Sequence, residues 1–469
     1  MCSSDLSLEV ENSEKEKDRG IFTKADRNSK KSGDISISAD NSVLIKSTAR
    51  EERQGIFSIT EKEGGEGGKI TIDADSLTVE TARREQGIFT ITKVNGQKGG
   101  DIIITADDSI SIIASRDGRQ HGIFTLTDPE GGTGGSIQIT AGSLTVESKK
   151  ETPGISAITK GDGDSGSITI NVSGDVELKK KGTIRTEQIE NKKVDKNDKK
   201  GRPGDVLLNV LGNVTLNDRS RIQIFNGGAA DGGKITILAG GVVEVKFSSK
   251  IENVAKQKST GSSGGIDIQA KSLLLDSRNP SDPESRRGQV QITAKTDKKT
   301  KGNGGPIDIR VGSLTMIGPN RAGSSGIRAN TSGAGNAGAI KIIVEGDFIM
   351  EDRAKIEAKS QRDAIGDGGK IIIEAGSLFL SNISFITAEA KKRSKGNPGS
   401  IQIKVNDKIE ITGQSSAIKT DIDEDAGNNQ TLEEGGAANI TIETRSLSIK
   451  DGGRISASTQ GKIKAGDIT

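Results

Sequence analysis

The sequence contains no tryptophan and no tyrosine, and it has only 9 phenylalanines among its 469 residues. A globular core of this size normally uses aromatic rings to fill irregular volume. Their near absence indicates a thin, regular core built from Ile, Val, Leu and Ala. Clefts that bind sugars also need aromatic platforms, so the composition argues against a polysaccharide-binding cleft.

Several other features are missing as well. A single cysteine, Cys2, excludes an internal disulfide framework and a zinc site built from cysteines. No apolar run approaches the length of a membrane-spanning helix, so we expect no membrane span. The first 20 residues lack the apolar segment of a secretory signal peptide. The formal net charge of +2 is close to balance, and we therefore expect no nucleic-acid partner.

Glycine, in contrast, is abundant, with 62 residues, and many glycines precede the same short apolar pattern. GGKITIDADSLTVE at 67–80 recurs as GSIQITAGSLTV at 135–146 and as GKIIIEAGSLFL at 369–380. One unit repeated along a chain is the signature of a solenoid or an array. The unit recurs about every 33 residues, and its starting positions are Gly33, Gly68, Gly100, Gly135, Gly166, Gly204, Gly233, Gly264, Gly305, Gly338, Gly369, Gly399, Ala438 and Gly466.

Each unit carries three short runs with alternating apolar and polar residues, which predicts three strands. In the unit at Gly68, the first strand turns Ile70, Ile72 and Ala74 inward, and the second turns Leu77 and Val79 inward. The corner between these two strands has nearly constant length, whereas the other two corners absorb the variation between units. The sequence therefore predicts an all-β fold, a single-stranded right-handed parallel β-helix of about 14 coils with three short strands per coil. A β-propeller blade would need four strands, and a leucine-rich repeat needs a segment that is absent here.

The two ends of the chain differ from the repeats. Residues 1–6, MCSSDL, match the translation of a common sequencing-adapter end, and we interpret them as a non-native leader. Residues 465–469 stop in the middle of a unit. We therefore expect 7–469 to be one continuous β-helix repeat region that is truncated at both ends.

The motif GGxIxIxAxSLxV, followed by GIxA and a Gly-rich corner, resembles the repeat region of filamentous haemagglutinin-like proteins of Gram-negative bacteria, especially the cyanobacterial type. The closest local match is 451–461, DGGRISASTQG, followed by AGDIT at 465–469. The resemblance covers 7–469 and implies a right-handed β-helix. It also implies export with an outer-membrane two-partner-secretion transporter as partner, a secreted or cell-surface location, and a structural or adhesive function that mediates attachment to an unknown receptor or glycan. The surface is richer in Lys, Arg, Glu and Asp than is usual in that family.

Catalysis is the competing interpretation, because several parallel β-helices cleave polysaccharides with clustered carboxylates. The candidates are Asp107-Asp108 and the group Asp421, Asp423, Glu424 and Asp425, but we favour the interpretation that they are solvated loop and corner carboxylates. The single histidine, His121, is interpreted as a surface residue because Gln54 and Gln86 occupy its place in neighbouring units. We therefore expect no enzyme and no cofactor in this segment. The alternatives are a rod that presents an enzyme or effector domain lying outside these residues and, more weakly, a β-helical polysaccharide lyase or hydrolase.

A metal site is also considered at 161–166, GDGDSG, which resembles half of a calcium-binding Gly/Asp turn. Calcium-binding repeats of this kind need the turn in successive coils. The next coil has KGRPG at 200–204 instead. We therefore expect a tight turn and no metal.

Phenylalanine recurs at one position of the third strand in four successive units, always after isoleucine. In later units, such as Ile356-Glu357-Ala358, Ile and Ala must face inward and the middle residue outward. This register places the phenylalanines on the outer face as an apolar stripe, a candidate contact surface. The alternative is that the rings lie in the core or are covered by another part of the protein. The candidate partner contacts are Phe22, Phe57, Phe89 and Phe124.

The longest irregular stretch is basic. Between 179 and 202 there are ten Lys or Arg and four acidic residues. Such a segment could bind an acidic glycan through salt-sensitive contacts, or it could be a solvated loop that aids solubility. The candidate contacts for an anionic polymer are Lys179, Lys180, Lys181, Lys192, Lys193, Lys199, Lys200 and Arg202.

Overall fold

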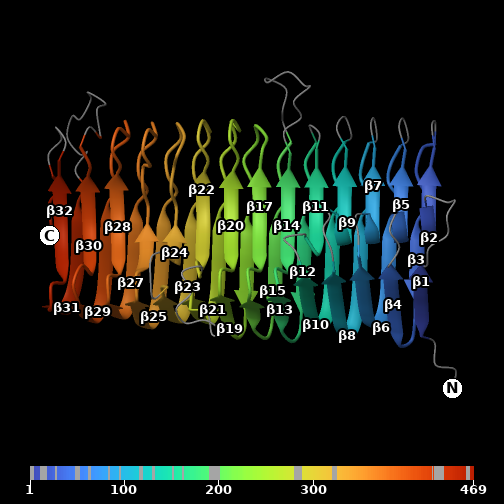
Figure 1. Cartoon of the computed structure of the whole chain (residues 1–469), viewed down its shortest axis with the longest axis horizontal. Helices are drawn as coiled ribbons and strands as arrows, with labels where there is room; N and C mark the ends of the chain where they lie inside the picture. The colour runs from blue at the N-terminus through green and yellow to red at the C-terminus, as the bar shows by residue number, and fades with distance from the viewer. Residues whose placement is uncertain are drawn as a thin grey trace. The chain divides into compact units, whose positions relative to one another are not determined.

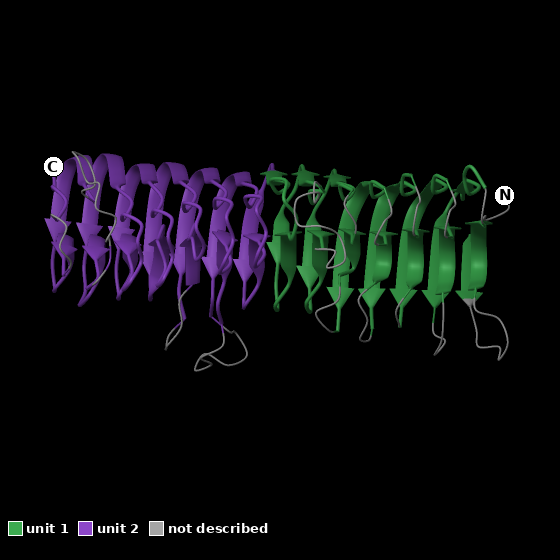
Figure 2. Cartoon of the chain, turned by 90° about the horizontal axis from the view of Figure 1, so that it is seen from above, with its two compact units in different colours: residues 1–238 green, residues 239–469 purple. Residues whose placement is uncertain are grey.

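The computed structural model describes most of the chain as stacked strands. It describes residues 5–10, 18–26, 29–47, 53–61, 65–82, 85–93, 97–115, 120–128, 132–149, 153–160, 163–189, 201–278, 288–319, 325–424, 426, 438–460 and 465–469. Two compact units divide the chain, Met1–Leu238 and Ala239–Thr469 (Figure 2). The described residues contain strands and no α-helix, so none of them forms a helix that is long and apolar enough to cross a membrane.

Unit 1 contains two sets of parallel strands (Figure 1). The first and second strands of the coils are β1 (Leu6–Val10), β3 (Ile35–Ser38), β4 (Ser42–Ser47), β6 (Ile70–Thr81), β8 (Ile102–Ala114), β10 (Ile137–Ser148), β12 (Ile168–Val172), β13 (Val176–Lys179), β15 (Val206–Val210), β16 (Val214–Leu216) and β18 (Ile235–Ala239). The third strands are β2 (Asp18–Ala25), β5 (Arg53–Thr60), β7 (Gln86–Thr92), β9 (His121–Thr127), β11 (Ile155–Thr159), β14 (Thr183–Gln188) and β17 (Arg221–Asn226).

Unit 2 repeats this arrangement. Its first and second strands lie in β19 (Val242–Lys246), β21 (Ile266–Asp276), β23 (Ile307–Ile317), β25 (Ile340–Glu351), β27 (Ile371–Leu380), β29 (Ile401–Ile411) and β31 (Ile440–Ile449). Its third strands are β20 (Lys250–Ala255), β22 (Gln291–Thr296), β24 (Ser325–Arg328), β26 (Ala354–Glu357), β28 (Phe385–Ala390), β30 (Ala417–Ile422) and β32 (Arg454–Thr459). Each unit is a parallel β-solenoid, which confirms the predicted fold class.

The inward columns follow the predicted alternation. Ile70, Ile72, Leu77 and Val79 are at most 1% exposed, and Ala74 is 6% exposed. Each column pairs with its counterpart one coil away, for example Ile72 with Ile104. Because the same apolar residue type returns at the strand spacing of about 4.8 Å, the apolar residues of each interior coil are buried by the two neighbouring coils. This nearest-neighbour burial is the physical basis of a solenoid.

Two corners differ from the prediction. In β6 the first and second strands form one continuous strand, because only Asp75 separates Ala74 from Ser76. The neighbouring β8 has two residues there, which shifts the register locally. The corner after the second strand, predicted to be variable, is a tight left-handed turn in several coils, such as Lys180-Lys181 with φ of 48° and 71°.

Two features hold successive coils together at the entry to the first strand: closely packed glycine backbones and a ladder of side-chain hydrogen bonds. Glycine allows close approach of the backbones: a Cβ on Gly100 would lie 2.0 Å from the carbonyl oxygen of Gly68. Beside it runs a ladder of Asp and Asn side chains, each accepting a backbone N–H from the next coil. Examples at this corner are Asp34 Oδ1 to Lys69 N (2.7 Å), Asp101 Oδ1 to Ser136 N (2.8 Å), Asp205 Oδ1 to Lys234 N (2.7 Å) and Asn439 Oδ1 to Asp467 N (2.9 Å).

Candidate functional surface

The phenylalanines of the first four third strands form a continuous ring stack. Phe22, Phe57, Phe89 and Phe124 pair in register across β2, β5, β7 and β9. Successive ring centroids lie 5.0, 4.8 and 4.7 Å apart, and the ring planes are within 5° of parallel. The stack follows the strand spacing, so each inner ring is covered on both faces by its neighbours.

The predicted exposure of this stripe is wrong for three of its four members. Phe57, Phe89 and Phe124 are 0% exposed and belong to a buried cluster with Ile59 and Ile91. Strand alternation places the equally buried Ile56 on the opposite face of β5. The third strands of this region therefore have an apolar layer on both faces, and only Phe22, at 42% exposed, remains accessible to a partner.

A bend in β5 brings the side chains at its two ends together. Arg53 Nη1 lies 3.9 Å from Glu61 Oε1, although Arg53 is the first residue of β5 and Glu61 follows its last residue. Eight residue steps of straight strand span about 26 Å, more than the two side chains can bridge. The strand must therefore turn back, and Gly55, with φ of 123°, has the backbone conformation that permits it. The Arg53 guanidinium also contacts Asp18, at 3.0 Å.

The histidine was also placed incorrectly by the sequence. His121 pairs in register with Gln86, as the repeat predicts, but its side chain is 0% exposed. Gln54 and Gln86 are buried in the same column and are joined by a hydrogen bond of 3.4 Å. His121 is therefore an interior residue of the bent strand, and the expectation of a surface position is wrong.

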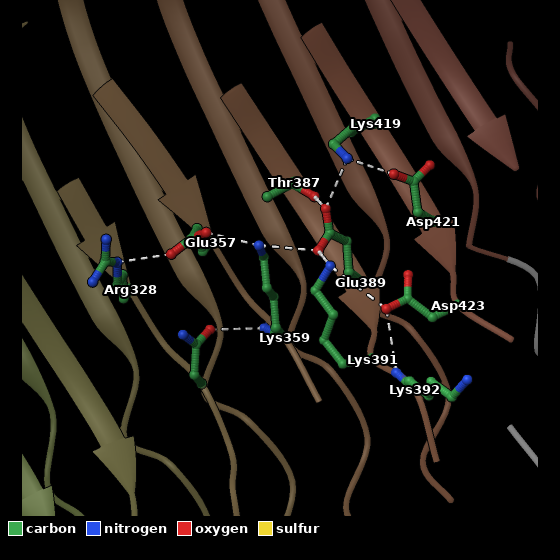
Figure 3. Close-up of polar contacts among 11 residues, drawn as sticks. Arg328, Glu357, Lys359, Thr387, Glu389, Lys391, Lys392, Lys419, Asp421 and Asp423 are labelled. Atoms are coloured by element: carbon green, nitrogen blue, oxygen red, sulfur yellow. Dashed lines mark hydrogen bonds and ion pairs between the residues drawn. The ribbon is translucent and has the colours of Figure 1, made fainter. Parts of the chain in front are cut away.

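On the corresponding face of unit 2, the outward positions hold a network of charges (Figure 3). Glu389 lies at its centre and is 2% exposed. Its carboxylate is 3.0 Å from the amines of both Lys359 and Lys419 and 2.5 Å from that of Lys391. The Thr387 hydroxyl donates a further hydrogen bond of 2.6 Å. Four neighbours from three successive coils thus surround one buried carboxylate: Thr387 and Lys419 lie on β28 and β30, and Lys359 and Lys391 lie just beyond the ends of β26 and β28.

The electrostatics of this centre lower the pKa values of both buried glutamates. Burial by itself would raise the pKa of Glu389, but the charge of Lys359, the hydrogen bond from Lys391 and the charge of Lys419 outweigh it and hold the pKa well below its usual range. The pKa of Glu357 is also lowered. Burial would raise it, but the charges of Lys359 and Arg328 have the larger opposite effect. Both carboxylates are therefore ionised at neutral pH, the opposite of what a general acid requires.

The carboxylates considered for catalysis are part of this network or lie on the surface. Asp421 pairs with Lys419 at 2.5 Å, Asp423 lies 3.8 Å from Lys391, and Glu424 pairs with Lys392 at 2.9 Å. Asp425 lies outside the described residues. Asp108 accepts a hydrogen bond of 3.1 Å from the Ser76 hydroxyl. Asp108, Asp421, Asp423 and Glu424 thus each have an observed structural contact, whereas Asp107 is exposed.

Sequence analysis missed this network because its members are 30 residues apart in the chain. The available signal was alternation that begins in each third strand and continues just beyond its end, as in Thr387, Glu389 and Lys391. Opposite charges in neighbouring units at a shared register would have completed the signal. Recognising it requires the strand register, which the sequence did not provide for each corner.

Only part of the predicted basic surface can be placed. Lys180 pairs with Glu147 at 2.7 Å, and Lys179 pairs with Glu177 at 2.9 Å. The Lys181 amine donates a hydrogen bond of 3.3 Å to a backbone carbonyl, and Arg202 lies 3.8 Å from Asp164. These four contacts tie neighbouring coils or adjacent residues together. Lys192, Lys193, Lys199 and Lys200 lie outside the described residues.

Residues 161 and 162 of the turn considered for calcium lie outside the described residues, and Asp164 of that turn is used for coil stacking. Asp164 Oδ1 accepts the backbone N–H of Arg202 at 2.9 Å. Among the described residues there is no group of three or more His, Cys, Asp or Glu side chains arranged to hold a metal ion.

No family model, curated protein or solved structure matches the chain. The resemblance to filamentous haemagglutinin-like repeats therefore rests on the repeat motif itself. What the structure adds is the solenoid architecture and the chemistry of its faces.

Proposed function

We propose that the chain is a structural and adhesive segment of a large secreted or cell-surface β-helical protein, without catalysis in this segment. The observation that carries the proposal is that side chains on the third strands pack or pair with those of neighbouring coils. In unit 1 this face holds a buried ring stack, and in unit 2 it holds carboxylates neutralised by neighbouring lysines. These side chains are committed to joining coils, which suits a protein that presents surface over many repeats.

The cellular setting of the proposal comes from the repeat motif. Its resemblance to filamentous haemagglutinin-like proteins supports export through an outer-membrane two-partner-secretion transporter of a Gram-negative bacterium. The β-solenoid is consistent with that route, because coils stack through local contacts with their neighbours. The attachment partner is a surface receptor or glycan.

Attachment is tested directly with the purified chain. Beads coated with it should bind to cyanobacterial or other Gram-negative cells more strongly than beads coated with an unrelated β-solenoid of similar charge. Removing glycans from the target cells with periodate separates a glycan from a protein receptor. Equal binding of both kinds of bead would contradict an adhesive function and favour a purely structural segment.

The basic segment makes a separate prediction. Binding of the chain to an immobilised acidic polysaccharide should fall steeply between 50 and 500 mM salt, because exposed charges are screened over about 10 Å at 0.1 M. Replacing Lys192, Lys193, Lys199 and Lys200 by glutamine should abolish the binding. Lys180→Gln is the matched control, because Lys180 is paired with Glu147 and its loss should change binding little. Salt-independent binding would contradict the prediction.

A further inference from the structure

Four loops in the interior coils of unit 2 share one turn, at the edge where the third strands end (Figure 1). They follow β20, β22, β26 and β28, which lie in one parallel sheet with β24. In each loop a backbone N–H donates to the carbonyl three residues earlier, as from Ser259 to Lys256 at 3.0 Å and from Ser394 to Lys391 at 2.8 Å. The next side chains follow the same order in every loop: two exposed, one buried and one exposed.

We name these loops the basic ridge, which consists of 257–260, 298–301, 362–365 and 392–395. Its exposed residues include eight Lys or Arg and one acidic residue, Asp363. The backbone does not require this composition. The second residue of each segment has a φ between 61° and 72°, a conformation that Gly and Asn adopt most easily, yet it is Lys or Arg in three of the four segments.

Much of the positive charge on the basic ridge is not neutralised by neighbouring carboxylates. The Arg393 guanidinium donates two hydrogen bonds to Asp363, at 2.7 and 3.1 Å. In contrast, Lys299, Lys301 and Lys395 are exposed, and no ion pair joins them to any residue that the structure describes. These three amines are therefore available to an anionic partner.

An exposed isoleucine lies among these lysines. Ile365 is 51% exposed, although its loop has described coils on both sides. The Ile365 N–H donates to the Gly333 carbonyl at 2.9 Å, and the Lys395 N–H donates to the Ala364 carbonyl at 2.8 Å. Ile365 occupies the same position in its loop as Lys395 does in the next loop of the basic ridge. An apolar side chain at this position remains in water unless a partner covers it.

We propose that the basic ridge binds the surface of an anionic lipid bilayer. Lys and Arg near such a surface are attracted to its phosphate headgroups. Ile365 enters the boundary between headgroups and acyl chains, where burial of apolar surface adds to the attraction. The third strands from β20 to β28 are four steps of about 4.8 Å apart, so the charges extend over about 19 Å and meet several headgroups at once. A bilayer is a different partner from the receptor or glycan proposed above, and the inference does not depend on either.

An acidic polymer is the competing partner. Single-stranded nucleic acids are bound with aromatic side chains on which bases stack, and the basic ridge contains no aromatic residue. An acidic polysaccharide would use the lysines but would leave Ile365 exposed to water. The combination of basic residues with an exposed isoleucine therefore favours a lipid surface.

The charges are tested by flotation of the whole chain with lipid vesicles at low salt. The chain should bind vesicles of phosphatidylglycerol and phosphatidylcholine in equal parts, and it should bind pure phosphatidylcholine vesicles little. Each basic residue near an anionic surface strengthens binding about fivefold. A ridge variant that removes three of them should therefore bind roughly 100-fold more weakly. This ridge variant combines Lys299→Gln, Lys301→Gln and Lys395→Gln.

The matched control removes the same charge from the other sheet of unit 2. It combines Lys271→Gln on β21 with Lys404→Gln and Lys408→Gln on β29. These three lysines are also exposed, and the control variant should bind the anionic vesicles nearly as the original chain does. Both triple variants should unfold at the same urea concentration as the original chain, because only exposed side chains are changed.

The isoleucine is tested separately from the charges. Ile365→Ser should weaken binding to the anionic vesicles about tenfold, because it removes most of the apolar surface that enters the bilayer. Ile365→Leu should bind as the original chain does. Leu211→Ser is the matched control, because Leu211 is exposed (71%) but lies in unit 1 and outside the basic ridge, and it should not change binding.

Several results would overturn the proposal. The first is an original chain that does not bind the anionic vesicles at low salt. Equal binding by the ridge variant and its control, or by Ile365→Ser and Ile365→Leu, would do so as well. Binding of the ridge variant to an immobilised acidic polysaccharide should equal that of the original chain. Loss of that binding, with vesicle binding unchanged, would identify the basic ridge as a polysaccharide site instead.

Discussion

Phe89→Ala is expected to destabilise unit 1 by about 3–5 kcal/mol, the usual cost of deleting a fully buried ring. Phe89 lies between Phe57 and Phe124, at 4.8 and 4.7 Å, so its loss leaves a cavity that interrupts the stack. Because solenoid stability is set by contacts between neighbouring coils, the damage should be local. Hydrogen exchange should accelerate in β5, β7 and β9, and urea denaturation should give the change in the free energy of unfolding.

Two matched variants control for this effect. Phe22→Ala removes a ring of the same stack that is 42% exposed and has one ring neighbour, so it should cost about 1 kcal/mol or less. Phe89→Leu keeps most of the apolar volume and should cost less than about 1.5 kcal/mol. Equal effects of Phe89→Ala and Phe22→Ala would show that the inner rings are not packed as described.

Glu389→Gln is expected to destabilise unit 2 by about 3 kcal/mol at pH 7. Removing one partner of a buried ion pair typically costs 3–5 kcal/mol, because the remaining charge is left uncompensated. We expect a cost at the low end of this range, because the side chain of Lys391 is 33% exposed and water can partly solvate its charge. Glu424→Gln is the matched control: Glu424 pairs with Lys392 at 2.9 Å but is 65% exposed. Its removal should cost less than about 1 kcal/mol.

The pH dependence of this difference identifies the charge as its cause. The folded-state pKa of Glu389 lies below the ordinary value of 4.5, so the unfolded chain binds a proton more readily than the folded chain. The stabilisation is therefore fully present above about pH 5 and declines as the pH falls below 4.5 toward the folded-state pKa. Urea titrations at pH 7, 5, 4 and 3 should show the free-energy gap between the original chain and Glu389→Gln closing in acid. A gap that stays constant would assign the loss to packing.

Much of the solenoid could be predicted from the sequence because the signal is local and repeated. The alternation of apolar and polar residues in Ile70–Thr81 identifies the inward residues, and recurrence of the unit predicts that each coil stacks on the next. The outward direction of the phenylalanines followed from the same alternation. Their burial did not follow, because alternation within one unit does not fix what packs over the third strands, where Phe57, Phe89 and Phe124 are 0% exposed.

The sequence by itself therefore determined the all-β architecture, the core columns and the parity of each strand, because all three depend on residues within one unit. Only the tertiary structure decided what lies on the third-strand face. Burial of Phe89 and His121, and the convergence of Lys359, Lys391 and Lys419 on Glu389, depend on backbone bends and on register between units about 30 residues apart. Side chains that meet across stacked coils are neighbours in space alone, and the corner geometry sets which ones meet.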